Sequence, residues 1–323
     1  MTDFTTRSAL VTGANSGLGF EAAAQLAELG YGNVIITART DEKAGAARAE
    51  LVARTGKETF DVLELDNFAF ETIEAAVATL AERGHKIDFL LLNAGLAPTK
   101  DISRTAEGIE ATVAASLVGH HLLTMRLLEA GLLGDQARIV IAGSEAARGD
   151  VPTFNPMEFD AFAGEYFGGD VEAAIEAYFR MDAPAAYKPG DVYATVKMFV
   201  AWWSAELAGR LPAGMTVNAV SPGSTPDTNA IRNAPFYMRR IMVPFFKIMP
   251  GMSHSVADGA GRYLEAAAYG EDVTGRFFAS KPKKMTGPLT EIQMDHLDDP
   301  AARRALWNVT SKIVGGVGYP ARA

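Results

Sequence analysis

The strongest constraint on the fold is a repeated order in which a short apolar segment precedes a longer helical pattern. The helical patterns lie at 18–29, 41–53, 68–83 and 105–130, and they alternate with apolar segments at 8–12, 33–37, 60–65, 87–92 and 138–142. Unbroken apolar runs are typical of strands buried on both faces of a parallel sheet. Right-handed crossovers between such strands place helices on both faces. The sequence therefore predicts an α/β fold with one doubly wound parallel sheet of about seven strands.

Two segments interrupt this order. Residues 150–188 are rich in Phe, Tyr, Asp and Glu, and residues 229–254 are rich in Met, Phe and Pro. Both follow strands at the end of the sheet where parallel α/β folds bind ligands. Long loops in compact domains are often functional. We interpret the two segments as insertions that form a substrate lid; the alternative is that they are surface excursions without substrate contact.

Composition narrows the class of function. The chain has 39 acidic and 30 basic residues and a formal charge of -9, which disfavours nucleic-acid binding because that role needs a concentrated basic surface. The chain contains no cysteine, which excludes disulfides, thiolate catalysis and cysteine metal sites. Neither a signal-peptide pattern nor a run of about 18 apolar residues is visible. We therefore expect no membrane span and a cytoplasmic location.

Three glycines follow the first apolar segment, in the run TGANSGLG that opens the first helical pattern. They are Gly13, Gly17 and Gly19. Glycine permits a tight turn and a close approach of the backbone to a phosphate. The helix that follows offers free N–H groups and the positive end of its dipole. A strand before and a helix after such glycines indicate a binding loop for the pyrophosphate of a dinucleotide.

The TGxxxGxG spacing of this loop resembles the short-chain dehydrogenase/reductase family. Three further motifs carry the resemblance, which covers nearly the whole chain: Asn93-Ala94-Gly95, Tyr193-x-x-x-Lys197, and the Pro222-Gly223 pair after the sixth expected strand. The resemblance implies a single NADP-binding domain of Rossmann type over residues 1–323. It also implies hydride transfer between a nicotinamide cofactor and a substrate carbon.

The resemblance predicts NADP(H) as the cofactor. In the family, an acidic residue that binds the adenosine ribose ends the second strand, whereas this chain has Arg39 there and no carboxylate. A guanidinium suits a 2′-phosphate; the alternative is that Arg39 is an ordinary surface residue. The cofactor contacts implied by the family are Gly13, Asn15, Ser16, Gly17, Leu18, Gly19, Arg39, Asp66, Asn93, Ala94, Gly95, Tyr193, Lys197, Pro222, Gly223, Thr225 and Thr228.

The catalytic set implied by the resemblance is Ser144, Tyr193 and Lys197. Tyr193 and Lys197 lie on one face of a helix at their i, i+4 spacing. A free tyrosine has a pKa of about 10, and a nearby ammonium and an oxidised nicotinamide both favour its phenolate. Tyr193 would then exchange a proton with the reacting oxygen. Lys197 would also hold the nicotinamide ribose, and Ser144 would orient the substrate oxygen.

One position departs from the family pattern. The helix after the Asn93 motif commonly carries an asparagine, and this chain has Ser116 in its place. Ser116 is a candidate for holding a water in a proton relay, although a hydroxyl has fewer hydrogen-bonding groups than an amide. The neighbouring His120 and His121 are interpreted as packing or surface residues. No metal site is expected.

The second half of the chain resembles the retinol dehydrogenase and light-dependent protochlorophyllide reductase branch. The resemblance lies in the run PGSTPDT, the apolar segment 236–249 and a helical pattern at 301–314. It implies a small-molecule substrate that is bulky and hydrophobic, with the reacting group a carbonyl or an alcohol. Basic residues in the second insertion, Arg232, Arg239, Arg240 and Lys247, leave a carboxylated substrate or an anionic membrane surface open. The candidate pocket residues are Phe154, Phe159, Phe162, Tyr166, Phe167, Phe236, Tyr237, Phe245 and Phe246.

Two other functions stay open. The first is reduction of a C=C bond, as in protochlorophyllide reductase, although that enzyme has a functional cysteine where this chain has Ser224. The second is an NADP(H)-binding sensor or scaffold without turnover. Association into a homo-oligomer is open as well, because Trp202 and Trp203 are typical of either a core or a subunit interface.

Overall fold

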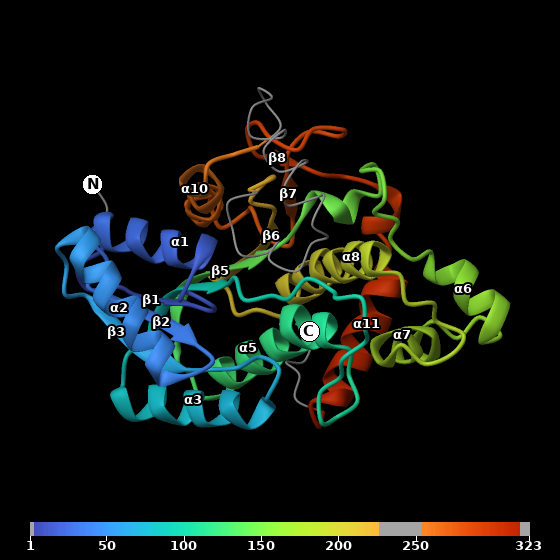
Figure 1. Cartoon of the computed structure of the whole chain (residues 1–323), viewed down its shortest axis with the longest axis horizontal. Helices are drawn as coiled ribbons and strands as arrows, with labels where there is room; N and C mark the ends of the chain where they lie inside the picture. The colour runs from blue at the N-terminus through green and yellow to red at the C-terminus, as the bar shows by residue number, and fades with distance from the viewer. Residues whose placement is uncertain (1–2, 226–252, 317–323) are drawn as a thin grey trace.

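An eight-stranded sheet forms the centre of the computed structural model, which describes residues 3–225 and 253–316 (Figure 1). The strand order is β3-β2-β1-β4-β5-β6-β7-β8, and all neighbouring strands are parallel except β7 and β8. This order confirms the doubly wound parallel sheet, and the short antiparallel β8 brings the number of strands to eight rather than seven. The strands are β1 (Ser8–Val11), β2 (Asn33–Ala38), β3 (Phe60–Glu64), β4 (Ile87–Leu92), β5 (Leu133–Ala142), β6 (Thr216–Val220), β7 (Phe277–Ala279) and β8 (Thr290–Glu291).

Burial of the central strands explains their unbroken apolar sequences. Every residue of β1 and of β6 is buried. β1 lies between β2 and β4, so the winding of the sheet reverses between β1 and β4. Loops that leave the carboxyl ends of neighbouring strands at such a reversal form the ligand crevice of open α/β folds. The glycine loop follows β1 and the Asn93 motif follows β4, so both lie at this crevice.

Helices cover both faces of the sheet (Figure 1). One apolar cluster joins the sheet to α1, α2 and α10, and the other joins it to α3, α5, α8 and the C-terminal helix α11. The predicted positions of α1, α2, α3 and α11 are correct to within a few residues, and the helix expected at 105–130 differs more. The helices are α1 (Gly17–Glu28), α2 (Asp41–Thr55), α3 (Phe70–Arg83), α4 (Ala111–Val113), α5 (Gly119–Glu129), α6 (Phe159–Tyr166), α7 (Val171–Arg180), α8 (Pro189–Ala208), α10 (Val256–Ala267) and α11 (Pro300–Ile313).

The helix expected at 105–130 is present, but it begins later than predicted and contains a π-helical turn. Its helical part begins at Ala111, where the buried Glu110 carboxylate caps α4 by accepting two backbone N–H bonds. A π-helical turn at Ala114–Val118 then separates α4 from α5. The Asn67 Nδ2 atom donates to the carbonyl of Ala115 at 3.0 Å, which satisfies a backbone group in this turn. Gly119 allows the close approach, because a Cβ atom there would lie 2.5 Å from the Asn67 carbonyl oxygen.

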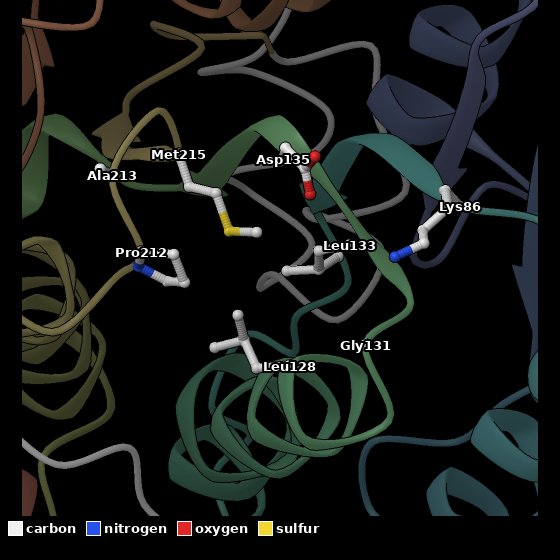
Figure 2. Close-up of a pocket in the computed structure, with 8 residues that line it drawn as sticks. All are labelled: Lys86, Leu128, Gly131, Leu133, Asp135, Pro212, Ala213 and Met215. Atoms are coloured by element: carbon white, nitrogen blue, oxygen red, sulfur yellow. The ribbon is translucent and has the colours of Figure 1, made fainter.

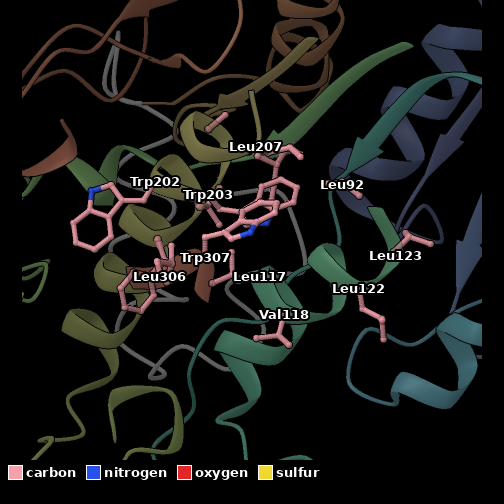
Figure 3. Packing of buried hydrophobic residues seen from close by; sticks show 14 of the residues in the cluster. Leu92, Leu117, Val118, Leu122, Leu123, Trp202, Trp203, Leu207, Leu306 and Trp307 are labelled. Carbon is pink, nitrogen blue, oxygen red and sulfur yellow. The ribbon is translucent and has the colours of Figure 1, made fainter. Parts of the chain in front are cut away.

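The two neighbouring tryptophans of α8 belong to the core of this chain (Figure 3). The indole N–H of Trp202 donates to the carbonyl of His296 at 2.8 Å. The indole N–H of Trp203 donates to Nδ1 of His121 at 3.0 Å, and the His121 ring meets Trp307 of α11 edge-on at 4.9 Å. The chain therefore covers these two side chains with its own C-terminal residues. Association into a homo-oligomer stays a prediction. Because Trp202 and Trp203 are buried inside this chain, they would not form the subunit interface.

The first insertion contributes to the core as well as to the surface. It contains two helices, α6 and α7. Phe159 and Phe162 are buried and pack with the apolar cluster under α8 rather than lining a pocket. Most of the second insertion lies outside the described residues. The candidate residues that fall there are Thr228, Arg232, Phe236, Tyr237, Arg239, Arg240, Phe245, Phe246 and Lys247.

Candidate active site

The glycine loop packs directly on the Asn93 motif. Gly13 has a φ of +64°, and a Cβ atom there would lie 3.1 Å from Cα of Ala94. A Cβ atom on Gly19 would lie 2.5 Å from Nδ2 of Asn93. That same Asn93 amide donates to the carbonyl of Thr12 at 3.0 Å, which ties the end of β4 to the end of β1. Larger residues at these glycines would displace the loop, so its backbone is held where a phosphate can approach it.

The N-terminus of α1 follows this loop, and its first backbone N–H groups are not capped by the side chain of Ser16. Ser16 is extended, with a φ of -168°, and among the described residues its side chain makes no capping bond to α1. The first N–H groups of a helix have no partner within the helix. Their direction and the helix dipole suit an anion such as a pyrophosphate. Asn15 and Ser16 lie in the turn before α1, and Gly17 and Leu18 are the first two residues of that helix.

The two expected adenosine contacts lie at the carboxyl ends of β2 and β3. Arg39 follows β2 directly and is exposed. The next residue, Thr40, caps α2 by accepting the N–H of Lys43 at 3.3 Å. Asp66 follows β3, and one of its carboxylate oxygens accepts the N–H of Phe68 at 3.0 Å. Arg39 therefore directly precedes the N-cap of α2 in the chain.

Ser144, Tyr193 and Lys197 come together at the carboxyl end of β5. Ser144 caps the short 3₁₀ turn Glu145–Arg148, and its hydroxyl lies close enough to the Tyr193 phenol to lower that phenol's pKa. Tyr193 and Lys197 both lie on α8, and Nζ of Lys197 is 5.8 Å from the centroid of the Tyr193 ring. The Lys197 ammonium donates to the carbonyl of Ala142, the last residue of β5, at 2.6 Å. A hydroxyl, a phenol and an amine thus share one site beside the glycine loop.

Burial changes the proton affinity of both titratable groups in this trio. Burial raises the pKa of Tyr193 above its ordinary value, the charge of Glu145 adds to the rise, and the hydrogen bond with Ser144 opposes it. Burial lowers the pKa of Lys197 to about 8, because the ammonium is the charged form and a low dielectric disfavours charge. At neutral pH the protein alone therefore holds a neutral phenol beside a cationic amine.

Ser116 lies behind the Asn93 motif, in the π-helical turn. It is 2% exposed, and within the described part of the chain its hydroxyl has no hydrogen-bond partner. A Cβ atom on Gly95 would lie 3.2 Å from that hydroxyl oxygen. His120 continues the buried polar path, because its Nε2 lies 3.0 Å from the Thr12 hydroxyl and its Nδ1 lies 3.3 Å from the Ser116 carbonyl. Burial lowers the pKa of His120 to about 3, so this imidazole is neutral.

A buried ionic cluster beneath the Pro222-Gly223 pair was not found by sequence reasoning. The Glu145 carboxylate accepts hydrogen bonds from the hydroxyls of Ser221 and Ser280, and its Oε1 lies 3.4 Å from Nη1 of Arg262. Arg262 also donates to the carbonyl of Ser221 at 3.0 Å and to that of Gly287 at 2.6 Å. These residues come from the β5 end, the β6 end, α10 and the segment after β7, so no local spacing in the sequence signals them.

The Pro222-Gly223 loop rests on this cluster. Gly223 has a φ of +77°, and a Cβ atom there would lie 2.3 Å from Cδ2 of His254. A Cβ atom on Gly259 of α10 would lie 2.7 Å from Thr225 and 2.9 Å from Leu18. Thr225 and Leu18 therefore approach each other across α10, which joins this loop to the N-terminus of α1. Both residues belong to the cofactor set predicted from the sequence.

The cavity in Figure 2 lies at the amino ends of the strands, opposite the carboxyl ends where Ser144, Tyr193 and Lys197 meet, so it is not the candidate active site. It has a volume of about 280 Å³ and is lined by residues near the amino ends of β4, β5 and β6, among them Lys86, Leu133 and Met215. Ligands of open α/β sheets bind at the carboxyl ends of the strands.

Over residues 3–225 and 253–316, no helix is long and apolar enough to cross a bilayer, and no group of three acidic or histidine side chains is placed to hold a metal.

Known proteins share both the sequence pattern and the fold. Residues 7–156 match the family model described as short chain dehydrogenase. Short chain dehydrogenase yanD of Aspergillus niger is 30% identical over 295 residues, which cover 86% of this chain and 83% of that protein. Protochlorophyllide reductase of Avena sativa is 27% identical over 95% of this chain and 99% of its own length. Human retinol dehydrogenase 13 is 26% identical over 96% of this chain and 85% of its own length.

A solved structure of a variant actinorhodin polyketide ketoreductase with NADPH shows the same fold. It superposes with a TM-score of 0.62 at 24% identity, covering 86% of this chain and 96% of that one. The similarity to retinol dehydrogenase 13 and to protochlorophyllide reductase confirms the branch that the second half of the chain predicts. From its own motifs, its fold and these relatives, the chain belongs to the short-chain dehydrogenase/reductase family.

Proposed function

We propose that this protein is an NADP(H)-dependent oxidoreductase that transfers a hydride between the nicotinamide and the carbonyl or alcohol carbon of a bulky hydrophobic substrate. The observation that carries the proposal is the meeting of Ser144, Tyr193 and Lys197 beside the glycine loop. NADPH is named with the actinorhodin ketoreductase of the same fold, which supports the cofactor. The dehydrogenases and reductases among the relatives support the class of reaction.

The residues present fit such a cofactor. A Cβ atom at Gly13 or Gly19 would strike the Asn93 motif, so these glycines let the loop pack there, and the first N–H groups of α1, which Ser16 does not cap, would bind a pyrophosphate. Arg39 would bind the 2′-phosphate, and Lys197 would bind the nicotinamide ribose. The backbone at Pro222 and Gly223 would bind the carboxamide. When bound, NADPH supplies the hydride that the protein itself lacks.

The side chains of this chain would manage the proton and the orientation of the substrate. Because burial raises its pKa, Tyr193 stays a phenol at neutral pH and can donate its proton to the oxygen of a carbonyl under reduction. Ser144 already lies close to Tyr193 and would hold the same oxygen. The cationic Lys197 stabilises the phenolate that is left behind, because the two charges share a buried site. Ser116, with its free buried hydroxyl, is a candidate for holding the water that returns a proton.

The pH profile of ketone reduction is expected to follow Lys197. The pKa of Lys197 is lowered to about 8, so its ammonium is complete below that pH and is lost above it, while Tyr193 remains a phenol throughout this range. The kcat/KM for reduction should be level below about pH 8 and fall above it, by about tenfold for each further pH unit. Steady-state rates across this range measure the profile. A rate that stays level up to about pH 10 would contradict the assignment.

Cofactor choice is expected to depend on Arg39. Arg39→Ala should lower kcat/KM for NADPH by about 10-fold to 100-fold, because a charge-assisted bond to the 2′-phosphate is lost, and should leave the value for NADH nearly unchanged. Rates with each cofactor at saturating substrate measure the effect. Arg304→Ala, which removes an exposed arginine on α11, is the matched control and should change neither value. An equal loss for both cofactors would remove the 2′-phosphate role.

Reduction of a C=C bond is the second candidate, and one observation favours it. The oat protochlorophyllide reductase aligns over 99% of its length, so the resemblance is not confined to the cofactor domain. The backbone of Ser224, which stands at the position of that family's functional cysteine, bonds Met285 and His254 and closes the loop after Gly223. Turnover of protochlorophyllide only under illumination would favour this candidate. Ketone reduction in the dark with NADPH would favour the main proposal.

A further inference from the structure

One aromatic residue of the first insertion differs from the others in its neighbours. The rings of Phe159, Tyr178 and Phe179 pack on Phe199 of α8, deep in the core. Phe154 is only half-buried, and its ring centroid lies 5.9 Å from that of Tyr193 at an interplanar angle of 55°. The insertion therefore places one partly exposed aromatic ring beside the residue proposed to move the proton.

The chain next to Phe154 is fastened to the helix that carries Tyr193. The backbone N–H and the side-chain amide of Asn155 both donate to the Asp191 carboxylate, at 3.1 and 3.0 Å. The N–H of Met157 donates to the Thr195 hydroxyl at 2.9 Å. Asp191 and Thr195 lie on either side of Tyr193 in α8. The insertion and the catalytic tyrosine therefore share one support, so Phe154 keeps a fixed place relative to the phenol.

A strained turn brings Phe154 to this place. Thr153 has a φ of +74°, a left-handed conformation that costs a β-branched residue energy. Gly190, in the first turn of α8, makes room for the turn, because a Cβ atom there would lie 2.6 Å from the Thr153 carbonyl oxygen. Strained residues of this kind persist only where the surrounding contacts determine the backbone, and they gather at functional sites.

We infer that Phe154 is a specificity-determining wall of the substrate site and that it selects a carbonyl joined to a flat, conjugated group. This inference rests on the proposed function. A conjugated substituent placed on a carbonyl held by Ser144 and Tyr193 would meet the open face of Phe154. Flat π-systems gain more from an offset or tilted contact with such a ring than puckered aliphatic groups of the same size. The wall therefore discriminates by shape and electron distribution rather than by volume.

The test compares two ketones of nearly equal size, acetophenone with its flat ring and cyclohexyl methyl ketone with its puckered ring. The wild-type enzyme should reduce acetophenone with the higher kcat/KM. Phe154→Ala should lower the ratio of the two values by about tenfold, and Phe154→Tyr should retain it. The KM for NADPH should be unchanged in both variants. If Phe154→Ala does not fold, Phe154→Leu removes the aromatic face with less loss of volume and should lower the ratio in the same direction.

Tyr166→Ala is the matched control. Tyr166 belongs to the same insertion, and the sequence made it a candidate pocket residue. The structure removes it from that set, because it is 52% exposed and its ring meets the core residue Phe162 rather than Tyr193. Its removal should leave the ratio of the two kcat/KM values unchanged. An equal loss for both ketones in Phe154→Ala would show that Phe154 only supports Tyr193, and it would overturn the inference while leaving the proposed function intact. A wild-type enzyme that binds NADPH but reduces no carbonyl would overturn the proposed function and this inference with it.

Discussion

Tyr193→Phe is expected to lower kcat by about 10²-fold to 10⁴-fold, while the affinity for NADPH changes little. The substitution removes one oxygen atom and keeps the ring that packs beside Phe154 and Lys197. The lost hydroxyl is the group that bonds Ser144 and would donate the proton to the substrate oxygen. Single-turnover oxidation of bound NADPH measures the chemical step, and the quench or enhancement of NADPH fluorescence measures affinity.

The same variant separates an enzyme from a sensor or scaffold. A protein that only binds NADP(H) would show no turnover before the substitution and no change after it. Tyr263→Phe is a matched control, because Tyr263 is another fully buried tyrosine, on α10, and the proposal gives it no role in proton transfer. Full activity in Tyr193→Phe would show that another group donates the proton.

Glu145→Ala is expected to lower the free energy of unfolding by about 3–5 kcal/mol. Glu145 and Arg262 are both buried, and their side chains are 2% and 5% exposed. Removal of the carboxylate leaves the guanidinium of Arg262 without its counter-charge and takes an acceptor from Ser221 and Ser280. An unpaired buried charge costs far more than the pair contributes. Chemical denaturation followed by circular dichroism gives the difference between the two proteins.

Two comparisons control this experiment. Glu74→Ala breaks an ion pair with Arg126 at the surface, with side chains 47% and 32% exposed, and should cost about 1 kcal/mol or less. Replacing Glu145 and Arg262 together by Leu and Met should recover part of the stability, because no buried charge is then left unpaired. A cost below about 1 kcal/mol for Glu145→Ala would show that Arg262 finds other acceptors.

Local motifs made much of the fold predictable. The alternation of apolar and helical patterns located the parallel strands, because a strand buried on both faces must be apolar along its whole length. The glycine loop was predictable for a similar reason, since a phosphate-binding turn needs particular residues within a few positions of one another. Ser144, Tyr193 and Lys197 were named from motifs, and the structure brings them together, although their catalytic roles remain a proposal.

Other features were beyond the reach of local pattern. The π-helical turn before Gly119 depends on an amide from Asn67 and on a close backbone contact that no periodicity reports. The aromatic residues of the first insertion looked alike in sequence, yet Phe159 and Phe162 are core residues and Phe154 contacts Tyr193. Whether each aromatic residue lies in the core or beside Tyr193 depends on which side chains it contacts after folding.

The sequence by itself determined the order of elements, the family and the position of the glycine loop, because each of these follows from residues that are close together in the chain. Only the tertiary structure decided that Glu145 pairs with Arg262, that Trp202 and Trp203 are covered by the C-terminal part of the chain, and that Phe154 faces the phenol. The physical reason is distance along the chain. Contacts between residues far apart in sequence depend on how whole helices and strands pack together, so a local sequence pattern cannot predict them.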